Sequence, residues 1–294
     1  MFCDLHTHST ASDGTTPPDE LATLARHAGL AALALTDHDT TQGLVDCQGA
    51  CEAQGIAFVP GIEVSADPHL SPRGVSDTVT PRRGTLHILG LFVRHDDKML
   101  AGITCSMTEA RDTRNPAIVE KLNKLGLTID YSEVRQLAAE QGTRIIGRPH
   151  IAQVLILHGH VDTFQQAFTR YIGYGAPAYV RRDRLAADQA IEAIHHAGGL
   201  AILAHPVQLQ LSDCDMLLEF VQQLKNIGLD GIETRHSDHS MEDIEQFEQL
   251  ASHCKLLTTG GSDFHGHRKP TPLASQHVPI QVYEQLRNAH QQRT

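Results

Sequence analysis

The sequence predicts an α/β protein in which helices surround a mainly parallel β-sheet that closes into a barrel. Three observations support this class. Short apolar runs alternate with helical patterns along most of the chain, seven such runs can be counted, and glycine residues follow several of the helices. The length of 294 residues is enough for one large α/β domain with a small domain appended to it.

Seven runs rich in Leu, Ile, Val and Ala are expected to form the strands. They are Phe2–Leu5, Ala32–Thr36, Ala57–Val64, Leu86–Val93, Leu200–Ala204, Gly231–Thr234 and Leu256–Thr259. Most of them are followed by a helical pattern, which is typical of βα units and of parallel pairing. Seven strands of this kind favour a barrel.

Six helices are expected around the sheet. They are Pro17–Ala28, Thr41–Gln54, Ala186–Ala197, Asp213–Ile227, Met241–His253 and Val282–Gln291. The first opens with Pro-Pro-Asp-Glu, and proline and acidic residues suit the first turn of a helix. Gly29, Gly55, Gly198 and Gly228 follow four of these helices, at the place where a glycine cap is common.

Two stretches interrupt this alternation. Residues 66–85 are rich in Pro, Ser, Arg and Gly, lack periodicity and are expected to be a long loop. Residues 103–182 have a helical pattern throughout, which predicts a small helical domain inserted between the fourth and fifth strands. The barrel would then consist of residues 1–102 and 183–294. The insertion is expected to form a lid or a wall of the substrate site.

Composition narrows the function classes. The net charge of −11, from 24 Lys and Arg against 35 Asp and Glu, is unfavourable for gripping duplex DNA by its phosphates. No apolar run approaches the ~20 residues of a membrane helix, and the six cysteines lack the spacing of a disulfide framework. A cytoplasmic protein without a membrane partner is therefore expected. Twenty histidines against eight Phe, five Tyr and no Trp favour metal or proton chemistry over stacking on bases.

Nearly every predicted strand ends in residues that can bind metal ions. These residues are His6, His8, Asp37, His38, Asp39, Glu63, His205, Glu233, His236, Asp263 and His265, with His87 inside the fourth strand. Since the carboxyl ends of parallel barrel strands meet on one face, the side chains are expected to form one site. Burying several carboxylates together is costly unless a cation compensates their charge, so the pattern predicts a metal centre.

The same residues resemble the motifs of a known family. The matching segments are Asp4-Leu5-His6-Thr7-His8-Ser9 with Asp13-Gly14, Thr36-Asp37-His38-Asp39, Gly61-Ile62-Glu63, His87-Ile88-Leu89-Gly90, Ala204-His205-Pro206 and Gly261-Ser262-Asp263-Phe264-His265. In order and kind they resemble the PHP (polymerase and histidinol phosphatase) phosphoesterases. The resemblance implies a distorted (β/α)7 barrel of the type shared with the amidohydrolases. The helical insertion and Gly147-Arg148-Pro149-His150 resemble the branch that removes the 3′-phosphate from nucleoside 3′,5′-bisphosphates and trims 5′-phosphorylated short RNA.

Carried over residue by residue, the family pattern implies two to three divalent metal ions. The first would be held by His6, His8, Glu63 and Asp263, the second by Asp13, His38 and His265, and the third by Glu63, His87 and His205. Glu63 would bridge two of the ions. Many relatives have His where this chain has Asp13, which makes the second site richer in oxygen. We expect Mn; Fe, Zn and Mg are alternatives that the ligand set does not exclude.

The mechanism implied by such a site is attack of a metal-activated hydroxide on phosphorus, because coordination lowers the pKa of water. Asp37 or His205 is expected to supply the proton that the leaving group needs. Arg148 and His150 lie at the predicted start of a helix over Pro149–Leu157, where free N–H groups favour a phosphate. A solvated helix start is the alternative interpretation.

Further substrate contacts are expected from Arg182, in a basic run with Arg181 and Arg184, and from His236 near the sixth strand. The expected enzyme is a metal-dependent phosphoric monoester hydrolase, and its partner is a small phosphorylated nucleotide or short single-stranded RNA. The alternatives are a histidinol-phosphate phosphatase, an amidohydrolase-type C–N hydrolase, and a metal-binding regulatory module. C–N hydrolases commonly use a carboxylated Lys as a bridge, and no Lys ends a predicted strand. Regulatory PHP modules lose ligands, whereas every expected ligand position here is filled.

Overall fold

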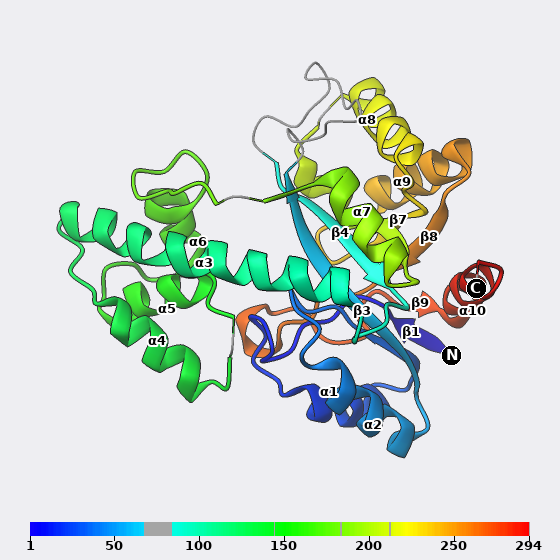
Figure 1. Ribbon diagram of the computed structural model, residues 1–294, viewed down its shortest axis with the longest axis horizontal. Coiled ribbons are helices and arrows are strands. Elements are labelled where there is room, and N and C mark those ends of the chain that lie inside the picture. The colour runs from blue at the N-terminus through cyan, green and yellow to red at the C-terminus, as the bar shows by residue number, and fades with distance from the viewer. Residues whose placement is uncertain (68–83, 144, 183, 212, 294) are drawn as a thin grey trace.

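The barrel contains all seven strands that the sequence predicts. We describe residues 1–67, 84–143, 145–182, 184–211 and 213–293 of a computed structural model (Figure 1). The barrel strands are β1 (Phe2–Asp4), β2 (Leu30–Leu35), β3 (Ala57–Asp67), β4 (Leu86–Leu91), β6 (Leu200–Leu203), β7 (Gly231–Arg235) and β8 (Leu257–Gly260). They are hydrogen-bonded in the order β8-β7-β6-β4-β3-β2-β1.

The two edges of this sheet meet just beyond β1 and β8. The Leu5 N–H donates to the Gly260 carbonyl at 3.1 Å, and Thr7 and Phe264 form a parallel bridge. Two short strands outside the prediction extend the sheet: β9 (Val278–Pro279) pairs with β1, and β5 (Leu185–Ala186) pairs with β3. The result is a nearly closed, distorted (β/α)7 barrel, as expected.

One strand departs from the parallel arrangement. β4 is antiparallel to both β3 and β6, whereas the remaining barrel pairs are parallel. His87, at the beginning of β4, therefore pairs with Ser65 near the end of β3. The reversal brings His87 to the end of the barrel where Glu63 lies.

The six predicted barrel helices are present, with ends that shift by up to three residues. They are α1 (Pro18–His27), α2 (Leu44–Gln54), α7 (Ala187–His196), α8 (Cys214–Asn226), α9 (Met241–Cys254) and α10 (Ile280–Gln291). The four predicted cap glycines all have positive φ, between 69° and 111°. Two 3₁₀ helices, Pro206–Leu209 and Gly266–Arg268, follow β6 and β8.

The strand period of two explains how the barrel holds both a core and a site. One set of alternate residues packs against the helices. The other set fills the interior with Cys3, Leu5, Ala32, Ala34, Val59, Leu89, Leu91, Leu200, Ile202 and Ala204. By the same period Glu63, His87 and Glu233 share this inner face, farther along their strands. The polar site therefore lies directly above the apolar interior.

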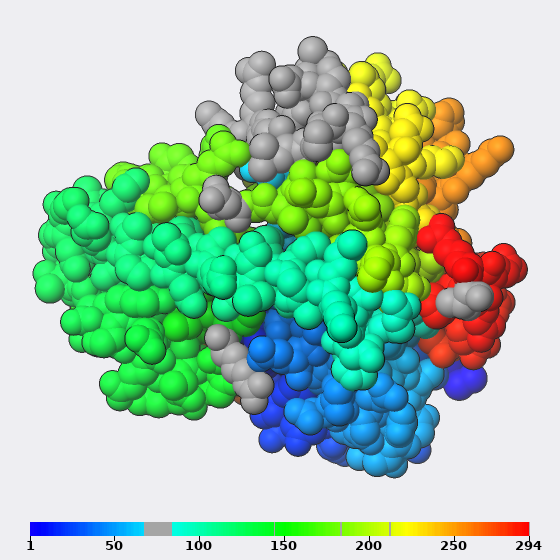
Figure 2. Space-filling model, in the orientation of Figure 1, coloured from blue at the N-terminus to red at the C-terminus, as the bar shows by residue number. Residues whose placement is uncertain are grey.

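The insertion forms a lobe beside the barrel, coloured green in Figure 2. It contains α3 (Lys98–Lys124), α4 (Tyr131–Glu140), α5 (Arg148–Leu157), α6 (Phe164–Ala167) and a π-helix (Phe168–Ile172). Its apolar residues form a cluster of their own. Helix α3 runs through the predicted boundary at 103 and connects the two parts: its Leu100 packs in the barrel cluster, and its Ile118 packs in the insertion cluster. The division at 103 and 182 stays a prediction.

The remaining expectations are met in part. Ala66 and Asp67 belong to β3 and not to the predicted loop, and residues 68–83 of that loop lie outside the described ranges. All six cysteines are free thiols, which agrees with the missing spacing of a disulfide framework; Cys105 and Cys214 are exposed, and the other four are buried. Among the described helices, none combines the length and the apolar character needed to cross a bilayer.

Candidate active site

The nine predicted metal ligands lie in one continuous cluster, at the end of the barrel where the parallel strands finish and the antiparallel β4 begins. Within this cluster, ligand atoms approach one another within 4.8 Å in four groups. The groups are His8, Asp13, His38 and His265; His6, His236 and Asp263; His6, Glu63 and His205; and His38, Glu63 and His87. The single site expected from the strand ends is therefore what the chain builds.

Glu63 lies at the centre of the cluster and is 1% exposed. Its Oε1 is 2.6 Å from His87 Nδ1 and 2.8 Å from His205 Nε2. Its Oε2 is 2.9 Å from the Nδ1 of His38, 3.2 Å from the Nε2 of His8 and 3.4 Å from the Nε2 of His6. One carboxylate thus faces five imidazoles, which suits the bridging position implied for Glu63.

Asp13 and His265 form the second part of the cluster. Asp13 Oδ1 is 3.3 Å from His265 Nε2 and 4.0 Å from His38 Nε2. His8 stacks on His265 with 4.2 Å between ring centroids. The second expected ligand set is therefore brought together, and His8 lies between it and the first set.

His236 is placed differently from the expectation that it lines the substrate pocket. Its Nε2 is 3.3 Å from Asp263 Oδ2, and its ring centroid is 5.7 Å from that of His6. The Lys269 ammonium also contacts Asp263. His236 therefore lies deep in the cluster, as a potential ligand beside the first predicted set.

The donor set fits divalent metal ions. His6 Nε2 and His8 Nε2 face each other at 3.1 Å, so two nitrogen lone pairs point into the same small space. Among the described residues, the buried atoms Asp13 Oδ1, Glu63 Oε2 and His236 Nε2 have ionisable neighbours at 2.9–4.0 Å but no well-aligned hydrogen bond. Buried polar atoms without partners are costly, and a cation held between imidazoles and carboxylates would satisfy them.

The electrostatics of the cluster agree with this fit. Burial disfavours charge on His8, but the close carboxylates of Asp263 and Glu63 outweigh it and raise the pKa of His8 to about 9. Burial would raise the pKa of Glu63, yet attraction from His38 and His87 holds it well below the usual range. The carboxylates therefore draw positive charge into the site, as protons on histidine or as metal ions.

Glu233 holds the ring of His6 and the backbone of His205. Its Oε1 is 3.0 Å from His6 Nδ1, and its Oε2 accepts the backbone N–H of His205 at 2.8 Å. Acidic groups behind metal-binding histidines commonly fix the ring orientation and tautomer. His205 and Asp263 also have positive φ values of 25° and 54°, a strained conformation typical of functional sites. The sequence analysis places Glu233 at a strand end but includes it in none of the three expected ligand sets.

Asp37 is not placed as a proton donor for a leaving group. Its Oδ1 accepts the Ser9 N–H at 2.8 Å and the Ser12 hydroxyl at 2.5 Å, and its Oδ2 accepts the Ser9 hydroxyl at 2.6 Å. With both oxygens committed to this turn, Asp37 fixes the backbone that follows His8. The geometry favours a structural role over the predicted catalytic one.

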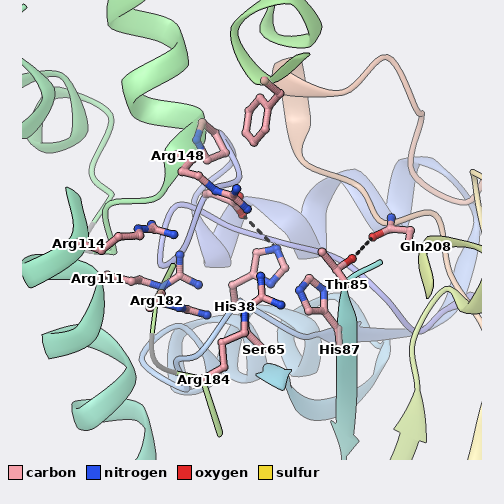
Figure 3. A pocket seen from close by; sticks show the side chains of 13 residues that line it. His38, Ser65, Thr85, His87, Arg111, Arg114, Arg148, Arg182, Arg184 and Gln208 are labelled. Carbon is pink, nitrogen blue, oxygen red and sulfur yellow. Dashed lines mark hydrogen bonds and ion pairs between the residues drawn. The ribbon is translucent and has the colours of Figure 1, made fainter. Parts of the chain in front are cut away.

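A cavity of about 240 Å³ opens beside the cluster (Figure 3). Asp13, His38 and His87 line one side of it. Five arginines also line it, and we call them the arginine wall: Arg111, Arg114, Arg148, Arg182 and Arg184. Phosphate and carboxylate groups are the ligands that arginine binds best, through paired N–H donors.

Two arginines of the wall share one carboxylate. Arg111 and Arg182 both donate to Asp39 Oδ2, the latter at 3.0 Å, and Ser65 donates its N–H to Asp39 Oδ1 at 2.8 Å. Asp39 is 1% exposed and directly follows His38. It therefore links the arginine wall to the nine predicted metal ligands and His236, which together we call the metal-type cluster.

The other arginines have fewer partners. Burial and the neighbouring Arg111 and Arg148 lower the pKa of Arg114 to about 8. Its guanidinium donates to Asn115 Oδ1 at 2.8 Å. Burial also lowers the pKa of Arg148 to about 10. The wall therefore concentrates positive charge that an anionic ligand would stabilise.

Three predicted substrate contacts can now be compared with their positions. Arg148 and Arg182 line the cavity, at the start of α5 and at the chain's return to the barrel. His150 does not line it; its Nδ1 accepts the Gly147 N–H at 2.9 Å and caps α5. Arg181 pairs with Asp67 at 2.8 Å. Arg111 and Arg114 were missed, although a spacing of three on a predicted helix places both on one face.

Comparison with known proteins places the chain in a family. Residues 4–180 match the model of the PHP domain. A 5′-3′ exoribonuclease of Haemophilus influenzae is 33% identical, over 89% of each chain. A 3′,5′-nucleoside bisphosphate phosphatase of Chromobacterium violaceum is 31% identical, over 89% of this chain and 86% of the relative. A phosphoribosyl 1,2-cyclic phosphate 1,2-diphosphodiesterase of Eggerthella lenta is 32% identical, over 95% of this chain and all of the relative.

A solved structure agrees with these matches. A protein from Bifidobacterium adolescentis, assigned as a metal-dependent phosphoesterase, superposes with a TM-score of 0.83 at 29% identity. The similarity covers 97% of this chain and 94% of that one, so barrel and insertion are both included. The chain therefore belongs to the PHP domain family and is a metal-dependent phosphoesterase.

Proposed function

We propose that the protein hydrolyses the 3′-phosphate of nucleoside 3′,5′-bisphosphates and releases nucleoside 5′-monophosphates. The observation that carries this proposal is the cavity of about 240 Å³, which has the metal-type cluster on one side and the arginine wall on the other. A substrate with two phosphates can place one at each side. The reacting phosphate would lie at the cluster, and the 5′-phosphate at the arginines.

The charge balance of the wall supports a second phosphate. Arg111 and Arg182 are paired with Asp39. In the described part of the chain, Arg114, Arg148 and Arg184 form no ion pair with a carboxylate. These three guanidinium groups can take a phosphate without first breaking an ion pair, so binding there is favoured.

The cluster would hold two to three divalent ions through its imidazoles and the carboxylates of Asp13, Glu63 and Asp263. We propose Mn, with Fe, Zn and Mg as alternatives. Such ions supply Lewis-acid charge and activate water when bound. Glu233 keeps His6 and His205 in position for them. We keep His205 as the proposed proton donor for the leaving group; within the described residues its Nδ1 makes no hydrogen bond and is not committed to another group.

The relatives support the same substrate class. One is named for nucleoside 3′,5′-bisphosphates and another for 5′-3′ trimming of RNA. We therefore also propose that the enzyme trims 5′-phosphorylated short RNA, since a 5′-phosphate at the arginine wall leaves the next phosphodiester for the cluster. We further propose that the enzyme acts in the cytoplasm and binds neither duplex DNA nor membranes.

The test uses the purified protein with Mn present and measures phosphate release from the small substrates and shortening of RNA by gel electrophoresis. The substrates are adenosine 3′,5′-bisphosphate, adenosine 3′-monophosphate, histidinol phosphate and a short RNA with and without a 5′-phosphate. We expect the highest kcat/KM with the bisphosphate, and shortening of the 5′-phosphorylated RNA alone. Faster hydrolysis of histidinol phosphate, or equal rates with the adenosine mono- and bisphosphates, would overturn the proposal. Metal analysis of protein purified without added metal checks the identity of the ion.

A further inference from the structure

Aromatic side chains gather in the insertion next to the arginine wall. The chain has eight Phe and five Tyr, and five of these thirteen residues lie between positions 164 and 179. They are Phe164, Phe168, Tyr171, Tyr174 and Tyr179. The low aromatic content of the whole chain argues against stacking on bases, but it says nothing about where the few rings are placed.

Contacts connect these rings to the cavity. Phe168 lines the cavity together with Arg148. The Arg148 guanidinium carbon is 5.4 Å from the Phe168 centroid and 5.9 Å from that of Tyr179. Tyr174 packs against Tyr179 with 5.4 Å between centroids and 61° between planes. The rings therefore continue outward from the arginine that the proposed 5′-phosphate would meet.

Tyr174 is the exposed member of the series. It is 63% exposed, whereas Phe168 and Tyr179 are partly buried. In the part of the chain that the structure covers, Tyr174 makes no cation–π contact with Arg148. A purely structural role in holding Arg148 accounts for Phe168 and Tyr179, but it does not account for Tyr174.

The backbone around Tyr174 is held by hydrogen bonds. The Gly173 N–H donates to the Phe168 carbonyl at 2.8 Å, and the Tyr179 N–H donates to the Ala176 carbonyl at 2.9 Å. Phe168 begins a π-helix, an arrangement that is rare and frequent at functional sites. Little ordering of this segment is therefore needed when a flat ligand binds.

We infer that Tyr174, supported by Tyr179, is a stacking surface for the nucleobase of the substrate. The inference rests on the proposed function, because it is the 5′-phosphate at Arg148 that brings the attached nucleoside to the edge of the cavity. Stacking accepts any base, since every base has a flat aromatic face. The ligand class is therefore a nucleotide, distinguished from a sugar phosphate by its base.

The test compares wild-type protein with Tyr174→Ala on two substrates. One is adenosine 3′,5′-bisphosphate, and the other is its abasic analogue, in which hydrogen replaces the base. For wild-type protein we expect a lower KM with the base present. Tyr174→Ala should raise the KM for the nucleotide about fivefold or more, the size expected for one lost stacking contact, with kcat and the abasic KM unchanged.

Leu157→Ala is the matched control, because Leu157 is an exposed apolar residue of the same insertion, 68% exposed, and does not line the cavity. It should leave both KM values unchanged. Equal KM values for the two substrates in wild-type protein, or an equal effect of Tyr174→Ala on both, would overturn the inference.

Binding of products separates this inference from the proposed function. Calorimetry with adenosine 5′-monophosphate and ribose 5-phosphate measures the effect of the base without any turnover. Tighter binding of the nucleotide, lost in Tyr174→Ala, supports the stacking surface even if the bisphosphate is not hydrolysed. Equal affinities contradict it even if phosphate release is fast.

Discussion

At the residue scale, Glu233 shows how a side chain outside the predicted ligand set can control it. It is fully buried and contacts the ring of His6 and the backbone N–H of His205. Both contacts come from one carboxylate on the inner face of β7. Loss of its charge would leave the His6 imidazole free to rotate, change its tautomer and weaken the anchor of the His205 backbone.

Glu233→Gln is therefore expected to weaken metal binding about 10- to 100-fold, the range typical for such supporting residues. Titration of metal-free protein with Mn by calorimetry measures this directly. Glu248→Gln is the control, since Glu248 is 45% exposed and pairs with Arg235 on the surface. Unchanged Mn affinity in Glu233→Gln would contradict the orienting role.

Arg148→Ala tests the arginine wall at the same scale. It removes a half-buried guanidinium that contacts the rings of Phe168 and Tyr179. A charge-assisted contact contributes about 1.5–3 kcal/mol, so the KM for adenosine 3′,5′-bisphosphate should rise at least about tenfold. The KM for adenosine 3′-monophosphate should hardly change. Arg170→Ala, which removes an arginine stacked on Tyr171 in the same insertion, should affect neither substrate.

At the scale of elements, the site depends on how closely the end of β8 approaches β1. A Cβ at Gly261 would lie 2.4 Å from both the nitrogen and the Cβ of His6. The Asp263 N–H donates to the His6 carbonyl at 2.9 Å just beyond this point. The segment carrying Asp263 and His265 can therefore meet His6 only if residue 261 has no side chain.

Gly261→Ala should separate these segments and remove most activity without changing any ligand. We expect kcat/KM for the bisphosphate to fall at least about 100-fold, as is common when reacting groups shift by about 1 Å. Gly49→Ala is the control, because a Cβ there meets nothing within 4 Å and Ala favours the helix α2. Full activity in Gly261→Ala would show that the segments can move apart without loss.

At the scale of the whole molecule, stability and activity are expected to separate. Three apolar clusters hold the barrel and the insertion, and none of them contains a residue of the metal-type cluster. Removal of metal with a chelator should abolish turnover and lower the melting temperature, while circular dichroism still shows the folded α/β protein. Added Mn should restore turnover. Unfolding on chelation would show that the ions hold the fold itself.

Acid stability of the whole molecule is expected to depend on Asp230, far from the cluster. Burial raises its pKa, but hydrogen bonds from His195, Arg293 and the Ala201 N–H outweigh burial and lower it. This stabilisation is complete above the ordinary aspartate pKa, about pH 4, and is lost as pH falls through the lowered pKa. Asp230→Asn should reduce the free energy of unfolding at pH 7 by about 1 kcal/mol. In urea unfolding, a difference from wild type that does not shrink in acid would contradict this assignment.

Much of the site could be predicted because successive strands of a barrel carry functional residues at equivalent positions. Parallel barrel strands end at the same face, so His6, Glu63 and Asp263 could be assigned to one place although they are far apart in sequence. The arginine wall could not be predicted in this way. Arg111 and Arg182 meet at Asp39 because the insertion folds back on the barrel, and no periodicity reports that contact.

The sequence alone determined the seven barrel strands and six barrel helices, the face on which the imidazoles and carboxylates gather, and the family. These depend on local periods of two and 3.6 and on strand-end motifs. Only the tertiary structure decided that β4 runs backwards, that Asp37 is committed to a turn, that His236 lies among the ligands and that five arginines and a row of aromatic rings lie beside them. The physical reason is that these arrangements depend on packing between segments distant in sequence, and such packing leaves no local pattern in the chain.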